Sequence, residues 1–148
     1  MIEIHDWPEW QDHDASLVST IMYLNGKHPD SKLGVGTGWC SPKIMQDFPP
    51  VEPFIEWAAE RIGTPYSRVH VWANVLRKYQ SIGPHDHYQA VGCGVFYLHT
   101  EGSSIRFGKD EYLPKDGQLI TFGPLDVHEV PPYEGVEPRT SISINLYE

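Results

Sequence analysis

The stretch Thr140-Ser-Ile-Ser-Ile-Asn-Leu146, near the end of the chain, alternates between polar and apolar side chains. Successive side chains of a β-strand point to opposite faces, so this pattern predicts a strand with one polar and one apolar face. The same alternation occurs in Val69–Leu76. Both segments therefore predict strands of a sheet that is covered differently on its two sides.

Further strands are predicted between these two. Val91–His99 is rich in glycine, β-branched and aromatic residues, Ser104–Phe107 is a short apolar segment, and Gln118–Phe122 follows a turn. Strands that recur about every 10–15 residues with turns between them are typical of a sandwich or a barrel. We therefore expect strands throughout residues 68–146.

One helix is clearly predicted, over residues 51–62. Pro53 suits its first turn, and Gly63 suits its end. A single apolar stripe is typical of a helix that packs on a sheet. The stripe consists of Phe54, Ile55, Ala58, Ala59 and Ile62.

Residues 1–50 are expected to be irregular, because turn signals such as Asn25-Gly26 and Pro49-Pro50 interrupt them. Within them, Leu17–Leu24 fits either a helix or a strand. The glycine-rich segment Gly34–Trp39 lacks the lysine of a phosphate-binding loop. Its glycines instead indicate a backbone that passes close to another part of the chain.

Composition narrows the class of protein. The 148 residues, 40% of them hydrophobic and five of them tryptophan, suffice for one domain, 1–148, with a core. A net charge of −9 argues against binding to nucleic acid or to a membrane surface. No apolar run is long enough to span a membrane, and two cysteines make no disulfide framework. We expect a soluble cytoplasmic protein.

Three histidines indicate a metal site. His85 and His87, two positions apart, share one face of a strand, whereas Asp86 points away. His128 follows another predicted strand, and a close pair with a distant third histidine can meet across the mouth of a barrel. Imidazole suits iron, zinc, copper and nickel. Of the other five histidines only His99, at the end of the strand after His87, is a further candidate.

Arg139 and Ser141 are predicted to share one face of the last strand. A guanidinium fork beside a hydroxyl suits a carboxylate. Taken alone, Arg139 would be expected in a surface ion pair. Next to a metal site, it indicates an anchor for an anionic co-substrate.

With these residues, the sequence resembles the 2-oxoglutarate- and Fe(II)-dependent dioxygenases, in particular a small branch with a minimal double-stranded β-helix. The resemblance covers about residues 34–146, nearly the whole chain. The order and spacing of the matching stretches are more specific than any stretch alone. They are Gly38–Ser41, Trp72–Asn74, Pro84–His87, Cys93–Leu98, Asp116–Phe122, His128 and Pro138–Leu146.

The resemblance implies a mainly β, cupin-like jelly roll with one or two flanking helices. It also implies Fe(II) bound by His85, His87 and His128, and 2-oxoglutarate as co-substrate with its far carboxylate on Arg139 and Ser141. Asn74 and Tyr97 would be polar contacts of the pocket. The implied reaction oxidises a small molecule or peptide and releases succinate and CO2. Part of the pocket would come from residues 1–50 or from a second copy in a homodimer.

The sequence departs from the superfamily at position 87. Most members have His-x-Asp with a distal histidine, whereas this chain has His87. Asp86 could supply the carboxylate only if the strand is bulged. The alternative is a three-histidine, cupin-like metalloprotein, either a dioxygenase independent of 2-oxoglutarate or a metal-binding module without activity. Cupins have a glutamate shortly after His-x-His, which residues 88–91 lack, and that alternative gives Arg139 no role.

Overall fold

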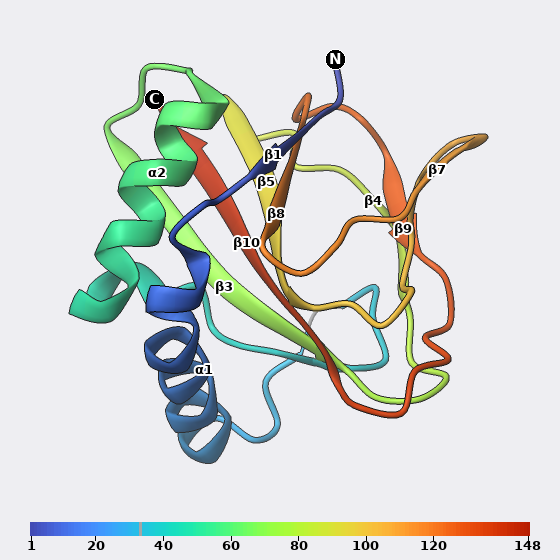
Figure 1. Cartoon of the computed structure of the whole chain (residues 1–148). Helices are drawn as coiled ribbons and strands as arrows, with labels where there is room; N and C mark the ends of the chain where they lie inside the picture. Colours follow the sequence, from blue (N-terminus) through green and yellow to red (C-terminus); the bar gives the residue numbers. More distant parts are fainter. Residues whose placement is uncertain (33) are drawn as a thin grey trace.

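The strands form two antiparallel sheets in the computed structural model, which describes residues 1–32 and 34–148. The larger sheet has the order β1-β8-β5-β10-β3-β2, and the smaller has the order β4-β9-β6-β7. Figure 1 shows the smaller sheet on the side of the molecule away from the helices. The strands are β1 Glu3–Asp6, β2 Trp39–Cys40, β3 Arg68–Leu76, β4 Ile82–His85, β5 Gly92–His99, β6 Ile105–Phe107, β7 Asp110–Tyr112, β8 Gln118–Phe122, β9 His128–Val130 and β10 Arg139–Tyr147.

Strand β10 lies in the middle of the larger sheet, between β3 and β5. The predicted alternation holds along it. Its apolar side chains, such as Ile144, belong to the core shared with the helices. Its polar side chains lie on the other face, where Ser141 is in register with Asn74 of β3 and with Tyr97 of β5. Three of the predicted site residues therefore form one row across three strands.

Two helices cover the outer face of the larger sheet (Figure 1). Helix α2, Glu52–Ile62, confirms the predicted helix, and Gly63 ends it with a φ of 75°. Helix α1, Trp10–Lys27, is the longer of the two. Two short 3-10 turns, η1 Met45–Asp47 and η2 Pro49–Val51, precede α2. The shared core includes Leu17, Ile21, Leu24, Phe54, Ala58, Phe96, Ile142, Ile144 and Leu146.

The N-terminal part differs from the irregular segment expected over residues 1–50. It contains strand β1 and the 18-residue helix α1. Leu17, Ile21 and Leu24 are buried there at helical spacing, which makes Leu17–Leu24 helical. The helix forms because this stripe packs on the sheet.

The glycine-rich segment passes close to β3, as its composition predicted. A Cβ atom on Gly38 would lie 2.7 Å from the carbonyl oxygen of Val75, too close for any other residue. Nearby, the amide of Gly83 donates a hydrogen bond to the carbonyl of Val35 (2.7 Å). The segment therefore holds the edge of β4 in place, beside His85.

The expected fold class is confirmed: the chain is mainly β, a double-stranded β-helix with two helices on one side. Apolar side chains between the sheets, among them Val95, Ile105 and Phe122, form a second core. Within residues 1–32 and 34–148, neither helix combines the length and the apolar character that a membrane span needs.

Candidate metal centre

Three histidines meet at one end of the space between the sheets. His85 ends β4 and is in register with His128 at the start of β9, and His87 lies two residues beyond β4. One ligand atom from each lies within 4.8 Å of the others. The ring centres are 4.4 Å apart for His85 and His128, and 5.0 Å apart for His87 and His128. Such convergence suits one metal ion.

In each of the three imidazoles, Nδ1 is hydrogen-bonded to an oxygen atom of the chain. Nδ1 of His85 is 2.9 Å from the carbonyl oxygen of Gly83, and Nδ1 of His128 is 2.9 Å from that of Asp126. Nδ1 of His87 is 2.5 Å from Oδ1 of Asn145. These oxygens only accept hydrogen bonds, so each Nδ1 carries the proton and each Nε2 presents a lone pair. The three Nε2 atoms are the ligands that a metal needs.

Burial keeps the two inner imidazoles neutral. It lowers the pKa of His128 to about 4, against the hydrogen bond to the carbonyl of Asp126. It also lowers the pKa of His87, against the hydrogen bond to Asn145. Both rings are therefore unprotonated at neutral pH, and an unprotonated imidazole is the form that binds a metal.

Asp86 lies outside the cluster. The register between β4 and β9 is irregular before His85, but the irregularity does not bring the carboxylate of Asp86 to the three histidines. Its Oδ1 instead accepts a hydrogen bond from the amide of Tyr88 (3.2 Å). Asp86 therefore stabilises the turn after His87, which leaves three imidazoles as the candidate ligands.

Arg139 is buried between the sheets, not exposed in a surface ion pair. Only 1% of it is exposed. Its Nε donates to Oγ of Ser103 (2.8 Å) and its Nη1 donates to Oγ of Ser141 (3.2 Å). The guanidinium lies 5.3 Å from the ring centre of Tyr97. Among the described residues no carboxylate lies within 4.0 Å of it, so this buried cation has no counter-ion from the chain.

Tyr97 adds an unused donor beside this cation. It is fully buried, and its hydroxyl makes no hydrogen bond within the part of the chain that the structure describes. Burial raises the pKa of Tyr97, although the nearby Arg139 opposes the rise, so the hydroxyl keeps its proton. In the same row, Nδ2 of Asn74 donates to Ser143 (3.2 Å). A buried hydroxyl without a hydrogen-bond partner and a buried guanidinium without a carboxylate partner, among the described residues, together suit an anion.

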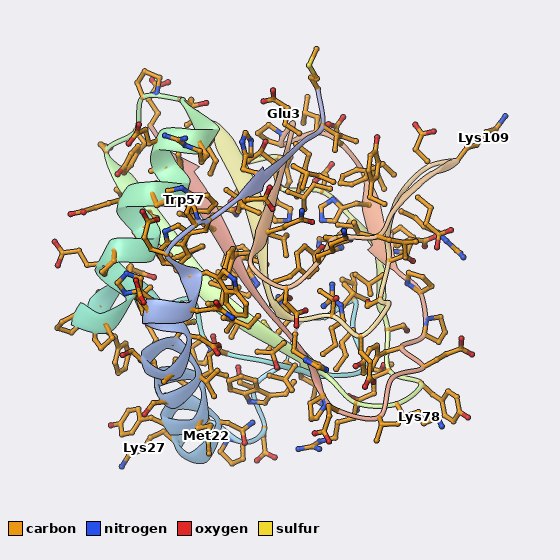
Figure 2. All side chains as sticks on the ribbon, viewed as in Figure 1. Glu3, Met22, Lys27, Trp57, Lys78 and Lys109 are labelled. Atoms are coloured by element: carbon orange, nitrogen blue, oxygen red, sulfur yellow. The ribbon has the colours of Figure 1, made fainter. Side chains whose placement is uncertain are left out.

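Two cavities adjoin the histidines. The inner one lies between the sheets, from the three imidazoles to Arg139, and its volume of about 20 Å³ means that side chains must move apart to admit a dicarboxylate. Its lining includes Asn74, Tyr97, Arg139 and Ser141. The outer one, of about 250 Å³, shares Trp72, His85 and His87 with the inner one. Figure 2 shows how densely side chains fill the space between the two sheets. A metal ion held by the histidines would border both cavities, because His85 and His87 line both of them.

The structure brings together all seven residues that the sequence singled out. His99 lies apart, 3.8 Å from a carboxylate oxygen of Asp116. Sequence reasoning missed Asn145 and Ser103. Asn145 carried a signal, because it lies on the same face of the last strand as Ser141. Ser103 carried none, since it belongs to a turn that only the fold brings to Arg139.

No family model matches this sequence, and no curated protein is detectably similar to it. Similarity to solved structures is extensive. The carbocyclase SnoK of nogalamycin biosynthesis, described as a non-haem, α-ketoglutarate-dependent enzyme, aligns with 97% of this chain and 78% of its own, with a TM-score of 0.76 and 10% identity.

Two prolyl hydroxylases align over nearly the whole chain. The prolyl-4-hydroxylase of Pseudomonas putida covers 99% of this chain and 92% of its own, with a TM-score of 0.69 and 14% identity. The prolyl hydroxylase of Trichoplax adhaerens, solved with a peptide fragment of hypoxia inducible factor, covers 99% and 83%, with a TM-score of 0.70 and 10% identity. At such low identity the likeness concerns the fold. The fold of this chain is that of the 2-oxoglutarate- and Fe(II)-dependent oxygenases.

Proposed function

We propose that this protein is a 2-oxoglutarate- and Fe(II)-dependent dioxygenase that oxidises a small molecule or a peptide. The observation that carries the proposal is the buried Arg139, which has no carboxylate partner among the described residues and faces a cavity that ends at three histidines. An unpaired buried charge is costly, because it has lost its water without gaining a counter-ion. A dicarboxylate in this cavity would supply the counter-ion.

The polar groups that line the inner cavity match the chemistry of 2-oxoglutarate at both of its ends. Arg139, Ser141 and the unpaired hydroxyl of Tyr97 would hold the far carboxylate. His85, His87 and His128 would hold the metal ion through Nε2 and leave positions open for the co-substrate. When bound there, iron(II) would supply the oxidative chemistry that converts 2-oxoglutarate and oxygen to succinate and CO2.

The chain itself supplies position and shielding. The row Asn74, Ser141 and Tyr97 fixes one wall, because it belongs to three paired strands. Apolar side chains of the other wall, such as Ile82 and Val130, exclude water from the inner cavity. The outer cavity, beside His85 and His87, would take the substrate to be oxidised.

One observation favours a second candidate. All three candidate ligands are imidazoles, and the described part of the chain offers no carboxylate at the cluster. Three neutral histidines are also the ligand set of the cupin-like metalloprotein considered above. In that protein the metal would act without 2-oxoglutarate, and Arg139 would have only a structural role.

Turnover separates the two candidates. Protein loaded with Fe(II) is incubated with oxygen and 2-oxoglutarate, alone and with a panel of amino acids and peptides, and succinate is measured. We expect succinate from the wild type and close to none from His128→Ala. A wild-type protein that binds Fe(II) but forms no succinate with any panel member would favour the second candidate.

A further inference from the structure

The outer cavity is lined by an exposed lysine, Lys43, that forms no ion pair with the described residues. Lys43 lines the cavity together with Trp72, His87 and Tyr147. Its Nζ lies 4.6 Å from the ring centre of Trp72, a cation–π distance. No carboxylate of the described residues lies within 4.0 Å of Nζ. The chain as a whole has a net charge of −9. A lysine without an ion-pair partner, in the same cavity lining as two candidate ligands, therefore gives this cavity a local group that can bind an anion.

The loop that carries Lys43 is hydrogen-bonded to β3 at the residues on both sides of Trp72. Before the lysine, Ser41 accepts a hydrogen bond from the amide of Ala73 through Oγ (2.9 Å). After it, Oε1 of Gln46 accepts from the amide of Val71 (2.9 Å), and Nε2 of Gln46 donates to the carbonyl of Lys43 (2.8 Å). The backbone of Lys43 is therefore fixed against the strand, and only its side chain is free to adjust.

The lining includes one lysine and one aspartate, Lys43 and Asp86, and the two differ in their partners. The acidic side chain of the same lining, Asp86, is accounted for by its hydrogen bond to the amide of Tyr88. Lys43 has no such structural partner, apart from the face of the Trp72 ring.

The rest of the lining suits an apolar or aromatic body. Trp72 lies 5.9 Å from His87, ring centre to ring centre, so one wall runs from the candidate metal site to the lysine. Tyr88 and Tyr147 supply further ring surface. A volume of about 250 Å³ suits a molecule of amino-acid size better than a folded partner.

We propose that the primary substrate carries an anionic group that binds Lys43, with its apolar body on Trp72 and its reacting carbon toward His85 and His87. This inference rests on the proposed function as far as oxidation of the substrate is concerned. Binding of an anionic group to Lys43 does not depend on it. Arg139 would hold the co-substrate in the inner cavity, and Lys43 would select the substrate in the outer one. Neutral molecules of the same shape would bind less well.

A matched pair of probes tests the proposal. Phenylacetate and its uncharged analogue phenylacetamide are titrated separately into Zn(II)-loaded protein with 2-oxoglutarate present. The indole N–H resonance of Trp72, identified with Trp72→Phe, reports binding without any turnover. We expect phenylacetate to bind about five-fold more tightly than phenylacetamide, the scale of one partly exposed charge pair. Added salt should reduce the preference.

Variants locate the effect. Lys43→Gln should remove the preference for phenylacetate. Lys78→Gln should keep it, because Lys78 also lies over an aromatic ring, Tyr79 at 5.4 Å, but does not line this cavity. Asp86→Asn should keep or increase it. Equal binding of the two probes, or an unchanged preference in Lys43→Gln, would overturn the proposal.

Two further measurements separate this proposal from the proposed function. If 2-oxoglutarate displaces phenylacetate, the probe occupied the Arg139 cavity, and the proposal for Lys43 is wrong. Binding of 2-oxoglutarate is measured independently by calorimetry. A protein that ignores 2-oxoglutarate but prefers phenylacetate through Lys43 would contradict the dioxygenase and retain the anion site.

Discussion

Asn145 fixes the orientation of His87, one of the three candidate ligands. Its Oδ1 accepts a hydrogen bond from Nδ1 of His87 (2.5 Å), and its Nδ2 donates one to the hydroxyl of Tyr147 (3.0 Å). The amide therefore links a candidate ligand to the lining of the outer cavity. Such partners of ligating histidines set the tautomer and the ring plane.

Asn145→Ala should lower the affinity for a divalent metal about 10- to 100-fold, because His87 loses the group that holds its proton on Nδ1. Metal affinity is measured by competition with a chelator. Ser143→Ala is the control, since Ser143 lies on the same face of β10 but bonds Asn74. If both variants keep the wild-type affinity, Asn145 does not position His87.

The low pKa of His128 predicts that the metal-free protein loses stability in acid. In the folded state this pKa is about 4, against an ordinary value of 6.5. Between these values the unfolded chain binds the proton and the folded chain does not, so stability falls as the pH falls. The loss between pH 7.5 and pH 5 should be about 2 kcal/mol for this residue.

Urea unfolding at the two pH values, without metal, measures this loss. His128→Phe removes the titrating group and suits the site, where His128 packs on Phe107 and Phe122. The variant should lose about 2 kcal/mol less than the wild type between the two pH values. An equal loss in both proteins would mean that His128 is not held neutral by burial.

At the scale of residues, the sequence predicted the side chains whose chemistry is distinctive. The alternation around Arg139 sufficed for Arg139 and Ser141, because strands have a fixed period. The prediction that His85 and His87 share one strand was wrong, since β4 ends at His85 and His87 joins the cluster from the loop that follows. Ser103 could not be predicted, since its contact with Arg139 joins a turn to a distant strand. Lys43 could not be predicted either, because its neighbour Trp72 lies on another segment.

Among the elements, α1 shows where sequence reasoning failed. Its buried stripe Leu17, Ile21 and Leu24 has helical spacing, but exposed apolar neighbours such as Met22 and Tyr23 obscure it. The N-cap residue, Glu9, makes no capping hydrogen bond through its side chain, so the usual start signal is missing. Helix α2 was easier to predict, because Pro53 and Gly63 mark its ends.

If α1 is a structural part of the sheet's cover, Leu17→Ala should destabilise the protein by about 2–5 kcal/mol, the usual cost of removing a fully buried leucine side chain. Leu17 is fully buried, whereas Met22 on the same helix is 68% exposed. Met22→Ala should therefore change the free energy of unfolding by less than about 0.5 kcal/mol. Equal effects, measured by urea unfolding, would contradict the packing of α1.

For the whole molecule, the two sheets supply different residues of the candidate site. The larger sheet supplies Arg139 and its row of polar residues, and the smaller sheet with its loops supplies the three histidines. Alternation predicted the shared face of Arg139 and Ser141, whereas Asn74 and Tyr97 were implied by the resemblance. The way in which the sheets face each other was implied only by the resemblance, because no local pattern specifies contacts between distant strands.

A metal ion at the histidines would connect β4, β9 and the loop after β4. Divalent zinc at 100 times its dissociation constant should therefore raise the free energy of unfolding by about 2.7 kcal/mol. A chelator should reverse the rise, and His87→Ala should abolish it. Thermal or urea unfolding measures the change. A similar rise in His87→Ala would show that the ion binds elsewhere.

The most direct test of the account is calorimetric titration of 2-oxoglutarate into Fe(II)-loaded protein without oxygen. Binding should weaken about 30-fold or more in Arg139→Ala and be restored in part by Arg139→Lys, since lysine lacks the fork. Metal content should not change. Arg106→Ala is the control, because Arg106 is exposed and pairs with Glu111. A wild type that does not bind 2-oxoglutarate, or an Arg139→Ala protein that binds it equally well, would contradict the account.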